Sequence, residues 1–593
     1  MTNADVARVL ERMAVMLELE GANTFRVRAY TNAARVISDH GEAVASLAGT
    51  PGALEALPGI GKDLAARIRD LVATGTTPPY EEMRARIPDE VVGFTELQGL
   101  GPKRVKTLFE TLGIRDRAAL EAAARAGRLR GLPGFGEKVE QNVLKALATA
   151  GQWAGRVLLA RAWPLAHALE ERVRAVPGVT RTELAGSFRR RRETVGDLDV
   201  LACGGDPERV MDAFAGHPSV ADVIGRGETK CSVRLQEGLQ ADLRVVPEAS
   251  FGAALLYFTG SKAHNIELRK RAIDHGWSLN EYGLTEGERT IASRTEEEIY
   301  RALGMAWIPP ELREGRDEVA LASEDRLPRL VEVSDLAGDL HMHTTRSDGR
   351  DTIDGMLEAA QARGLAYVAI TEHSKALAMA NGFDAARVRT SVREIEEARA
   401  RHPELAVFHG LEVDILGDGE LDLDDDTLAL LDWVVISIHS KFDMTPDAAT
   451  ARVLRALANP HVCAMGHPTG RLIGSREPVP FDVEQVAVAA ARLGVAMEIN
   501  ASPDRLDLSD VNARLARERG CRFVIDTDAH AAAQLDQVRF GVFQARRAGL
   551  TREDVLNTLP LGDFRGWLAT RRGGSKPVHK KPRTARGTTK KRN

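Results

Sequence analysis

The stretch that decides the fold reads Gly186-Ser187-Phe188-Arg189-Arg190 and, shortly after it, Gly196-Asp197-Leu198-Asp199-Val200-Leu201. Asp197 and Asp199 are two residues apart at the start of an apolar run, so a β-strand there would point both carboxylates to one face. A second apolar run carries Asp242. Three carboxylates on neighbouring strands can hold two Mg²⁺ ions, which activate an attacking hydroxyl and stabilise a leaving phosphate. The pattern therefore predicts phosphoryl transfer, although a lone Asp-x-Asp is more often part of a surface turn.

Groups able to bind phosphate lie beside this acid pair. The Ser187 hydroxyl and the amides of Gly186 and Ser187 would sit at a turn that holds phosphate oxygens, with Arg190 adding positive charge. Further motifs follow in order: Gly227-Glu228-Thr229-Lys230, Asp242, Tyr257-Phe258-Thr259-Gly260-Ser261 and Asn280-Glu281-Tyr282. This order resembles that of the family X DNA polymerases.

The resemblance implies an α+β nucleotidyltransferase palm at residues 151–250 and a thumb at residues 251–315. The residues of that family that match Asp197, Asp199 and Asp242 are catalytic and bind Mg²⁺ or Mn²⁺. The resemblance further implies contacts to the incoming dNTP and to DNA from Arg161, Ser187, Arg190, Lys230, Tyr257, Phe258, Gly260, Lys262, Asn265 and Arg269. Core packing remains the alternative for the adjacent Tyr and Phe, since aromatic residues in apolar runs are usually buried.

Two positions depart from the pattern of the animal members. Lys262 stands where an acidic residue lies beside the nucleotide, so a cation would approach the base or the triphosphate. Gln240 stands where an arginine lies two residues before the third aspartate, which leaves open how Asp242 is oriented. Gln240 therefore keeps an alternative function in view: a DNA-binding metallophosphoesterase, either a nuclease or an AP endonuclease, with a weak or inactive polymerase core.

Length and charge bound the organisation of the chain. Its 593 residues are enough for several domains, and its apolar fraction of 44% suffices for ordinary cores. The net charge is −5, but residues 571–593 carry ten Lys/Arg and no acid, whereas the rest holds 70 Lys/Arg against 85 Asp/Glu, a charge of −15. We expect this tail to be disordered and to bind DNA nonspecifically. No signal peptide or membrane-spanning run is visible, which indicates a cytoplasmic, nucleoid-associated protein.

A short glycine-centred unit recurs in the N-terminal part of the chain, and a helical pattern follows each copy. The copies are centred on Gly59 and Gly61, on Gly99 and Gly101, and on Gly134 and Gly136, at spacings of 40 and 35 residues. A single copy would be interpreted as a helix C-cap. Three copies resemble helix-hairpin-helix motifs, whose exposed amides and helix N-termini grip a DNA phosphate without reading bases.

By resemblance, residues 1–80 form a small helical domain that binds DNA ends, and residues 81–150 form helix-hairpin-helix fingers. In lyase members of family X a lysine forms a Schiff base, and its position corresponds to Arg67 here. A guanidinium cannot act as a neutral amine nucleophile near pH 7. We therefore expect this domain to bind phosphate but to lack strong lyase activity.

The C-terminal part has a different character. After a connector at residues 316–336, short apolar strands alternate with helical stretches, which is typical of parallel β/α units. Most of these strands end in a potential metal ligand, as in an active site at the C-terminal face of a barrel. The candidates are His341, His343, Asp348, His373, Glu412, His439, His467, Asp528 and His530. His402, His409 and His461 are interpreted as structural residues instead.

The nine candidates resemble the ligand set of the polymerase-and-histidinol-phosphatase (PHP) domain, here residues 337–570. The resemblance implies one metal held by His341, His343, Glu412 and Asp528, a second held by Glu412, His439 and His467, and a third held by Asp348, His373 and His530. Up to three ions, Zn²⁺ and/or Mn²⁺, would lower the pKa of bound water and neutralise phosphate charge. A barrel that uses metal only for stability is the alternative.

The sequence thus predicts a multidomain protein with a helical helix-hairpin-helix region, an α+β palm and thumb, and a C-terminal β/α PHP barrel. The resemblance implies a template-directed DNA polymerase that fills short gaps in DNA repair. It also implies a metal-dependent 3′-5′ exonuclease or phosphoesterase activity in the PHP domain. We expect gapped or nicked DNA and dNTPs as partners, no membrane association, and a monomer.

Overall fold

A computed structural model describes residues 3–39, 44–97, 100–137, 139–141, 143–144, 147 and 156–571. The chain divides into two compact units, residues 1–154 with 472–477, and residues 155–471 with 478–593. Among the helices that the structure describes, none has the length and apolar character that a membrane span requires. The predicted basic tail lies outside the described residues from position 572 onward.

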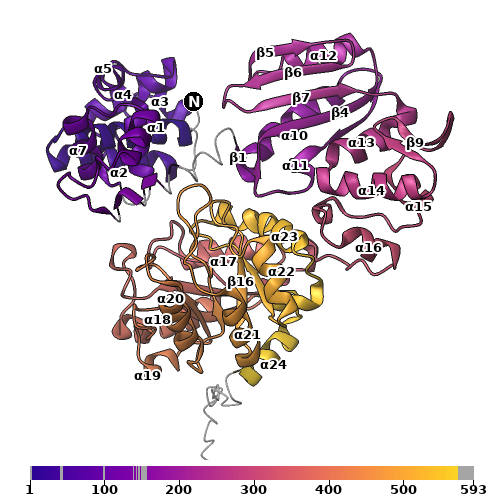
Figure 1. Cartoon of the computed structure of the whole chain (residues 1–593). Coiled ribbons are helices and arrows are strands. Elements are labelled where there is room, and N and C mark those ends of the chain that lie inside the picture. The colour runs from indigo at the N-terminus through magenta and orange to yellow at the C-terminus, as the bar shows by residue number, and fades with distance from the viewer. Residues whose placement is uncertain are drawn as a thin grey trace, which may run out of the picture. The chain divides into compact units, whose positions relative to one another are not determined.

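The N-terminal unit is built from short helices (Figure 1). They are α1 (Asn3–Leu19), α2 (Thr24–Asp39), α3 (Val44–Ala48), α4 (Lys62–Thr74), α5 (Pro78–Arg86), α6 (Asp89–Gly93), α7 (Pro102–Leu112) and α8 (Arg117–Arg125). Helix α4 shows why they pack: Leu64, Ile68 and Leu71 recur at helical spacing on its buried face. One apolar core runs through this whole region and holds the helices together.

The palm contains a five-stranded sheet in the order β2-β4-β7-β6-β5. Its elements are β1 (Val157–Leu158), α10 (Leu159–Arg174), β2 (Val179–Leu184), α11 (Gly186–Arg189), β3 (Thr194–Val195), β4 (Asp197–Gly204), α12 (Pro207–Ala215), β5 (Val220–Arg226), β6 (Lys230–Leu235) and β7 (Gln240–Val245). Strand β4 runs parallel to β7 and antiparallel to β2. Helices α10 and α12 pack on the sheet (Figure 1). The two strands predicted to carry the acids are therefore direct neighbours.

The thumb combines helices with a three-stranded sheet in the order β10-β9-β8. It comprises α13 (Phe251–Thr259), α14 (Lys262–Asp274), β8 (Ser278–Asn280), β9 (Gly283–Glu286), β10 (Arg289–Ala292) and α15 (Glu296–Ala302). The predicted connector differs from a plain linker, because it contains α16 (Glu318–Ser323). Buried Glu318 accepts hydrogen bonds from the amides of Gly315 and Arg316 and pairs with buried His264, which fastens this helix to the thumb.

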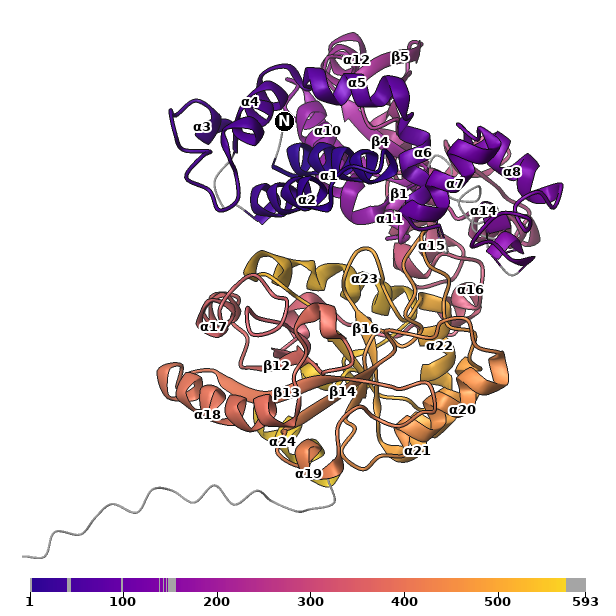
Figure 2. The same cartoon turned by 90° about the vertical axis from the view of Figure 1, so that its left-hand side faces the viewer.

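The C-terminal region is a parallel seven-stranded sheet in sequence order, β11 to β17. The strands are β11 (Gly338–Asp339), β12 (Tyr367–His373), β13 (Ala406–Asp414), β14 (Trp433–Ser437), β15 (Ala464–Met465), β16 (Ala496–Asn500) and β17 (Phe523–Asp526). The helices α17 (Ile353–Ala362), α18 (Ala385–Arg401), α19 (Asp425–Leu428), α20 (Pro446–Leu457), α21 (Val483–Leu493), α22 (Asp510–Glu518), α23 (Val538–Arg547) and α24 (Leu561–Arg571) surround it (Figure 2). A parallel bridge between Met342 and Ala529 joins the segments that follow the first and last strands, so the sheet is a nearly closed barrel.

Burial on both faces explains the strand sequences of this barrel. Every residue of β12 and β14 is buried, as expected for parallel strands covered by helices on one side and by a filled interior on the other. Polar residues within such strands are costly unless they have partners, so those that occur mark a site. The predicted fold class is confirmed for the helical N-terminal region, the thumb and the barrel.

Candidate functional site: a histidine-carboxylate cluster and a palm acid triad

The barrel strands deliver their polar residues to one end. His341 and His343 follow β11, His373 ends β12, and Glu412 lies near the end of β13. The remaining predicted ligands lie in the loops that follow the strands: Asp348, His439, His467, Asp528 and His530. The C-terminal edge of a parallel barrel gathers such loop residues by construction. The nine residues predicted as ligands thus meet in one cluster, in which each belongs to at least one group whose ligand atoms lie within 4.8 Å of one another.

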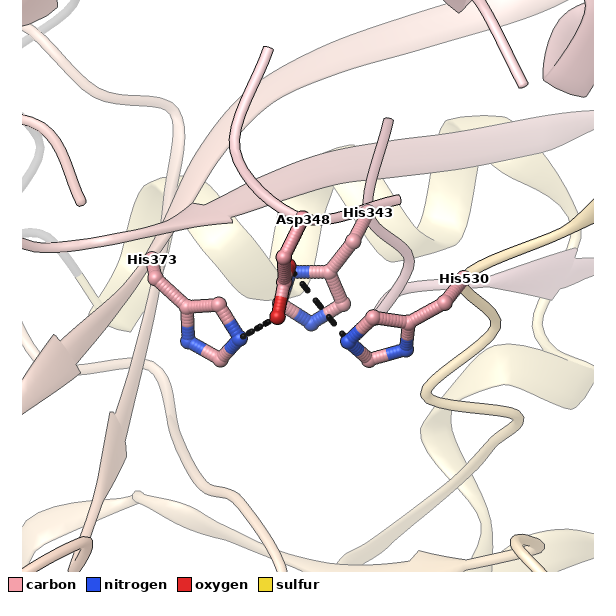
Figure 3. A group of neighbouring side chains, drawn as sticks. All are labelled: His343, Asp348, His373 and His530. Carbon is pink, nitrogen blue, oxygen red and sulfur yellow. Dashed lines mark ion pairs between the residues drawn. The ribbon is translucent and has the colours of Figure 1, made fainter. Parts of the chain in front are cut away.

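One group consists of His343, Asp348, His373 and His530 (Figure 3). Asp348 points its carboxylate between the rings, with Oδ2 3.4 Å from His373 Nε2 and Oδ1 3.5 Å from His530 Nε2. The rings of His343 and His530 are stacked, with centroids 4.2 Å apart. Imidazole nitrogens and carboxylate oxygens at these separations suit a Zn²⁺ or Mn²⁺ ion. His343 thus belongs to this group as well as to the group with His341 and Asp528, to which the family pattern assigned it.

Glu412 is the centre of the other groups. Its Oε1 lies 2.8 Å from His467 Nε2 and 3.3 Å from His439 Nε2, and its Oε2 lies 2.8 Å from His373 Nδ1. Asp528 stands beside the first pair of histidines, with Oδ1 3.2 Å from His343 Nε2. A fully buried carboxylate among so many imidazoles matches a ligand shared between metals.

Buried atoms without hydrogen-bond partners test whether metals fit this cluster. They include both carboxylate oxygens of Glu412, Nε2 of His341 and both ring nitrogens of His343. Leaving buried polar atoms unsatisfied costs about 1–3 kcal/mol each. All of these atoms are of the kinds that ligate Zn²⁺ or Mn²⁺, so bound cations would remove the cost. The donor set fits the implied metals.

Sequence reasoning missed the carboxylates that orient these ligands. Glu498, on β16, accepts a hydrogen bond from His341 Nδ1 at 2.7 Å and another from the amide of His467. Asp414 Oδ1 lies 3.2 Å from His439 Nδ1. Such partners fix the tautomer of a ligating histidine and raise its basicity. An acid inside the apolar run of β16, where no ligand was predicted, was the available signal.

Backbone strain marks the same end of the barrel. His467 has φ +24° and Asp528 has φ +54°, values that residues other than glycine rarely adopt. Two predicted ligands therefore hold conformations that cost of order 1–3 kcal/mol each. Surrounding contacts must offset this cost, as is common where ligand geometry matters.

The palm acids lie on adjacent parallel strands. Asp199 on β4 is in register with Asp242 on β7, and Asp197 begins β4. Burial, followed by the charges of Asp197 and Asp242, raises the pKa of Asp199 to about 7. A cation between the three carboxylates would relieve this repulsion, so the residues fit Mg²⁺ or Mn²⁺. Gly186, at φ +63°, is needed because an added Cβ would lie 2.4 Å from Asp199 Oδ2.

Two predicted contacts act on Asp242. Lys230 Nζ lies 2.7 Å from Asp242 Oδ2, and Gln240 Nε2 donates to Asp242 Oδ1 at 3.0 Å. The side chain in place of the family's arginine thus orients the same carboxylate. Although burial alone would raise the pKa of Asp242, these hydrogen bonds hold it below its usual value.

The other predicted nucleotide-contact residues have several different surroundings. Arg190 pairs with Glu314 at 3.2 Å and donates to the carbonyl of Thr259, next to Gly260, while the Oγ of Ser187 is buried without a partner. Tyr257, Asn265 and Arg269 line one small pocket of the thumb, and Arg269 lies over the Tyr257 ring. Phe258 carries Arg244 over its ring, whereas Arg161 and Lys262 are both exposed, in the first turns of α10 and α14.

The glycine hairpins precede helix N-termini as predicted where the structure describes them. Gly61 and Gly101 are the N-cap residues of α4 and α7, and Gly59 and Gly134 have φ near +80°. No neighbouring atom lies within 4 Å of a Cβ added at Gly61, Gly101 or Gly136, so their backbones face open space. Gly99 lies outside the described residues. Exposed amides at a helix start are suited to an anion.

Comparisons with known proteins support this division. A family model described as DNA polymerase beta thumb matches residues 254–314, and one described as PHP domain matches residues 339–501. Models of a helix-hairpin-helix domain and of a SAM-like helix-hairpin-helix tandem match residues 1–77 and 93–149.

Relatives resemble the chain over different lengths. A Bacillus subtilis (strain 168) protein named DNA polymerase/3′-5′ exonuclease PolX is 37% identical over 574 residues, which is 96% of this chain and 99% of that protein. A protein of Thermoanaerobacter sp. (strain X514) named probable phosphatase is 29% identical over 232 residues, 37% of this chain and 89% of its own length. A probable phosphatase of Shewanella sp. (strain MR-4) is 29% identical over 234 residues, 38% of this chain and 88% of its own length.

Proposed function

Since the chain belongs to the family X DNA polymerases that carry a C-terminal PHP domain, we propose that it fills short gaps in DNA and removes nucleotides from DNA 3′ ends. The observation that carries the polymerase half is the register of Asp199 with Asp242, which brings acids of two strands to one edge of the palm. The cluster around Glu412 carries the nuclease half.

In the palm, Asp197, Asp199 and Asp242 would hold the metal ions, and Ser187 and Arg190 would bind the triphosphate of a dNTP. Bound divalent ions would make the primer 3′-hydroxyl a better nucleophile in the palm, make water a better one in the barrel, and neutralise phosphate charge at both sites. Gln240 and Lys230 orient Asp242. The exposed amides at Gly61 and Gly101 would hold the DNA backbone, and gapped DNA and dNTPs are the proposed substrates.

In the barrel, the nine clustered residues would hold up to three ions of Zn²⁺ and/or Mn²⁺. Glu498 and Asp414 would keep His341 and His439 in the tautomers that present Nε2 to a metal. The chain would work on DNA in the bacterial cytoplasm, as a monomer associated with the nucleoid. The alternative of a weak or inactive polymerase core was argued from Gln240 alone. Because Gln240 donates a hydrogen bond to Asp242, it no longer supports that alternative.

A gapped, labelled primer-template tests both halves together. We expect primer extension with dNTPs, and shortening from the 3′ end without them, in assays across Mg²⁺, Mn²⁺ and Zn²⁺. Asp197→Ala with Asp199→Ala should abolish extension and leave shortening, because the two sites share no ligand. His341→Ala with His343→Ala should do the reverse, because it removes two ligands and the Glu498 contact.

Melting curves distinguish loss of chemistry from loss of fold. If the palm double variant still extends a primer, the acids are misassigned. If the barrel double variant melts earlier but its folded fraction shortens DNA at the wild-type rate, the cluster serves only stability.

A further inference from the structure

Arg505 is a cation beside the histidine-carboxylate cluster. It is neither a predicted site residue nor a member of a candidate metal site. It lies in the loop that follows β16, with its Nε 3.6 Å from Asp528 Oδ2. This separation is too long for a hydrogen bond. Its Nη1 is buried and has no hydrogen-bond partner. A guanidinium nitrogen in such a place costs stability unless something else binds there.

The unpartnered atoms of the cluster and of Arg505 require different kinds of ligand. Those of Glu412, His341 and His343 are potential metal ligands, which a cation satisfies. Arg505 differs, because a guanidinium has five donors, no acceptor and no capacity to ligate a metal. Only an anion or another acceptor can satisfy it. Asp528 does not do so, since its Oδ2 already accepts from Asn500 at 3.1 Å and its Oδ1 faces His343.

The loop around Arg505 is held by specific contacts. Arg471 donates from Nε to the carbonyl of Arg505 at 2.9 Å and from Nη2 to the carbonyl of Leu506 at 2.5 Å. Leu506 itself has φ +41°. Arg471 is anchored in turn by Glu193, with Nη2 2.7 Å from Oε2. A cation held this firmly loses little entropy when it binds an anion.

We propose that Arg505 binds a non-bridging oxygen of the phosphate on which the barrel acts, an inference that rests on the proposed phosphoesterase function. Arginine makes strong, charge-assisted hydrogen bonds to phosphate. In a water-poor site these bonds also stabilise charge that develops in the transition state. The role makes Arg505 a substrate-binding residue rather than a ligand of metal.

Phosphate binding tests this without any reaction. Inorganic phosphate is titrated calorimetrically into the full-length, manganese-loaded wild type, Arg505→Ala, Arg505→Lys and Arg522→Ala. Arg522 is the matched control, because its Nε is also buried without a partner but it precedes β17, at the opposite end of that strand from the cluster. Loss of hydrogen bonds to a charged group should weaken phosphate binding about tenfold or more in Arg505→Ala, with partial recovery in Arg505→Lys. Arg522→Ala should bind as the wild type does.

Two results overturn the inference. One is an unchanged affinity for phosphate in Arg505→Ala. The other is a loss of bound manganese per chain in Arg505→Ala, because Arg505 would then act through Asp528 instead of contacting phosphate. Primer extension at the wild-type rate confirms that the variant protein is folded.

Kinetics on two DNA ends identify the source of the phosphate. Primers ending in a 3′-hydroxyl present a diester to the barrel, and primers ending in a 3′-phosphate present a monoester. A fall in kcat/KM of about 100-fold on the first assigns Arg505 to the scissile diester. A fall confined to the second assigns it to a terminal monoester, and no fall on either contradicts the proposal. A wild type that degrades neither end refutes the proposed function, while the phosphate titration still decides the inference.

Discussion

His373 and His343 lie in the same cluster, and their surroundings drive their pKa values in opposite directions. Burial alone would lower the pKa of His373, but Glu412 and Asp348 raise it to about 10. Burial and the neighbouring His530 and His373 instead lower the pKa of His343 to about 3. Without metal ions, the carboxylates of the cluster are balanced by protonated imidazoles such as that of His373. Bound cations would take over this balancing of charge and displace the protons.

His409 shows the same physics away from the cluster and gives a pH prediction. It is buried, with Nε2 2.8 Å from Ser391 Oγ, and burial lowers its pKa to about 4, against the opposing effect of Asp432. Because the unfolded chain binds a proton at higher pH than the folded chain, stability is lost as pH falls below about 6.5. Between pH 7 and 5 this one residue should remove about 2 kcal/mol.

Urea unfolding of the full chain at the two pH values measures this effect. In His409→Gln, which keeps a polar group but does not titrate, the loss should be smaller by that amount. His275→Gln, at an exposed position of the thumb, is the control variant. An identical loss in wild type and His409→Gln would show that His409 is protonated without cost in the folded barrel.

Helix α15 owes its position to a buried ion network. Glu296 forms paired contacts with Arg313, at 2.6 and 3.0 Å, and with Arg189, at 2.7 and 2.9 Å. Trp307 Nε1 donates to the same carboxylate at 3.0 Å. Arg189 ends α11, the short helix whose Gly186 touches Asp199, so the network joins the thumb to the palm acids.

We expect Glu296→Gln to destabilise the palm and thumb by about 3–5 kcal/mol, because it leaves the buried guanidinium of Arg313 and the half-buried one of Arg189 without this counter-charge. Primer extension should fall with it, since α11 would lose its anchor. Glu297→Gln, on the exposed face of the same helix, is the control. Denaturant unfolding with extension assays checks both effects, and equal stability of the two variants would argue that the network is energetically neutral.

The sequence predicts which segments form helices and strands, but it does not predict which side chains contact one another across the fold. The alternation of apolar runs and helical stretches predicted the barrel, and the acids of β4 and β7 were placed on the correct strands. Helix α16 was missed because its stabilising contact, Glu318 with His264, joins residues far apart in the chain. Glu498 and Arg505 were missed for the same reason, since no local pattern states what a buried charge will face.

At the scale of the whole second unit, charged contacts join palm, thumb and barrel. Arg547, on α23, is almost fully buried and bonds to the carbonyl of Arg190, to Glu314 and to Asp510. Arg316 also reaches Asp510 from the thumb side, at 2.9 Å. Arg471 and Glu193 form a separate tie between the barrel and the palm. Because of these ion pairs and hydrogen bonds, barrel residues such as Arg547 contact the residues next to the proposed nucleotide site.

Glu314 is where these ties meet the nucleotide site, and it yields the last prediction. Arg190, proposed to bind the triphosphate, pairs with Glu314. Binding of a dNTP must therefore break this pair, which reduces affinity by the energy of the contact. Glu314→Gln weakens the ion pair that competes with the triphosphate for Arg190. The affinity for a dNTP, measured without DNA, should therefore rise about threefold to tenfold.

The control is Glu311→Gln, which removes a different thumb-to-barrel pair, with Arg546 at 2.8 Å, and does not touch Arg190. Both variants should lower the melting temperature, because each leaves an arginine without its carboxylate. Only Glu314→Gln should also bind the dNTP more tightly, so affinity and stability move in opposite directions in that variant. Calorimetric titration with a dNTP and Mg²⁺, beside melting curves, measures the two. An affinity that stays unchanged in Glu314→Gln would mean that a residue other than Arg190 holds the triphosphate.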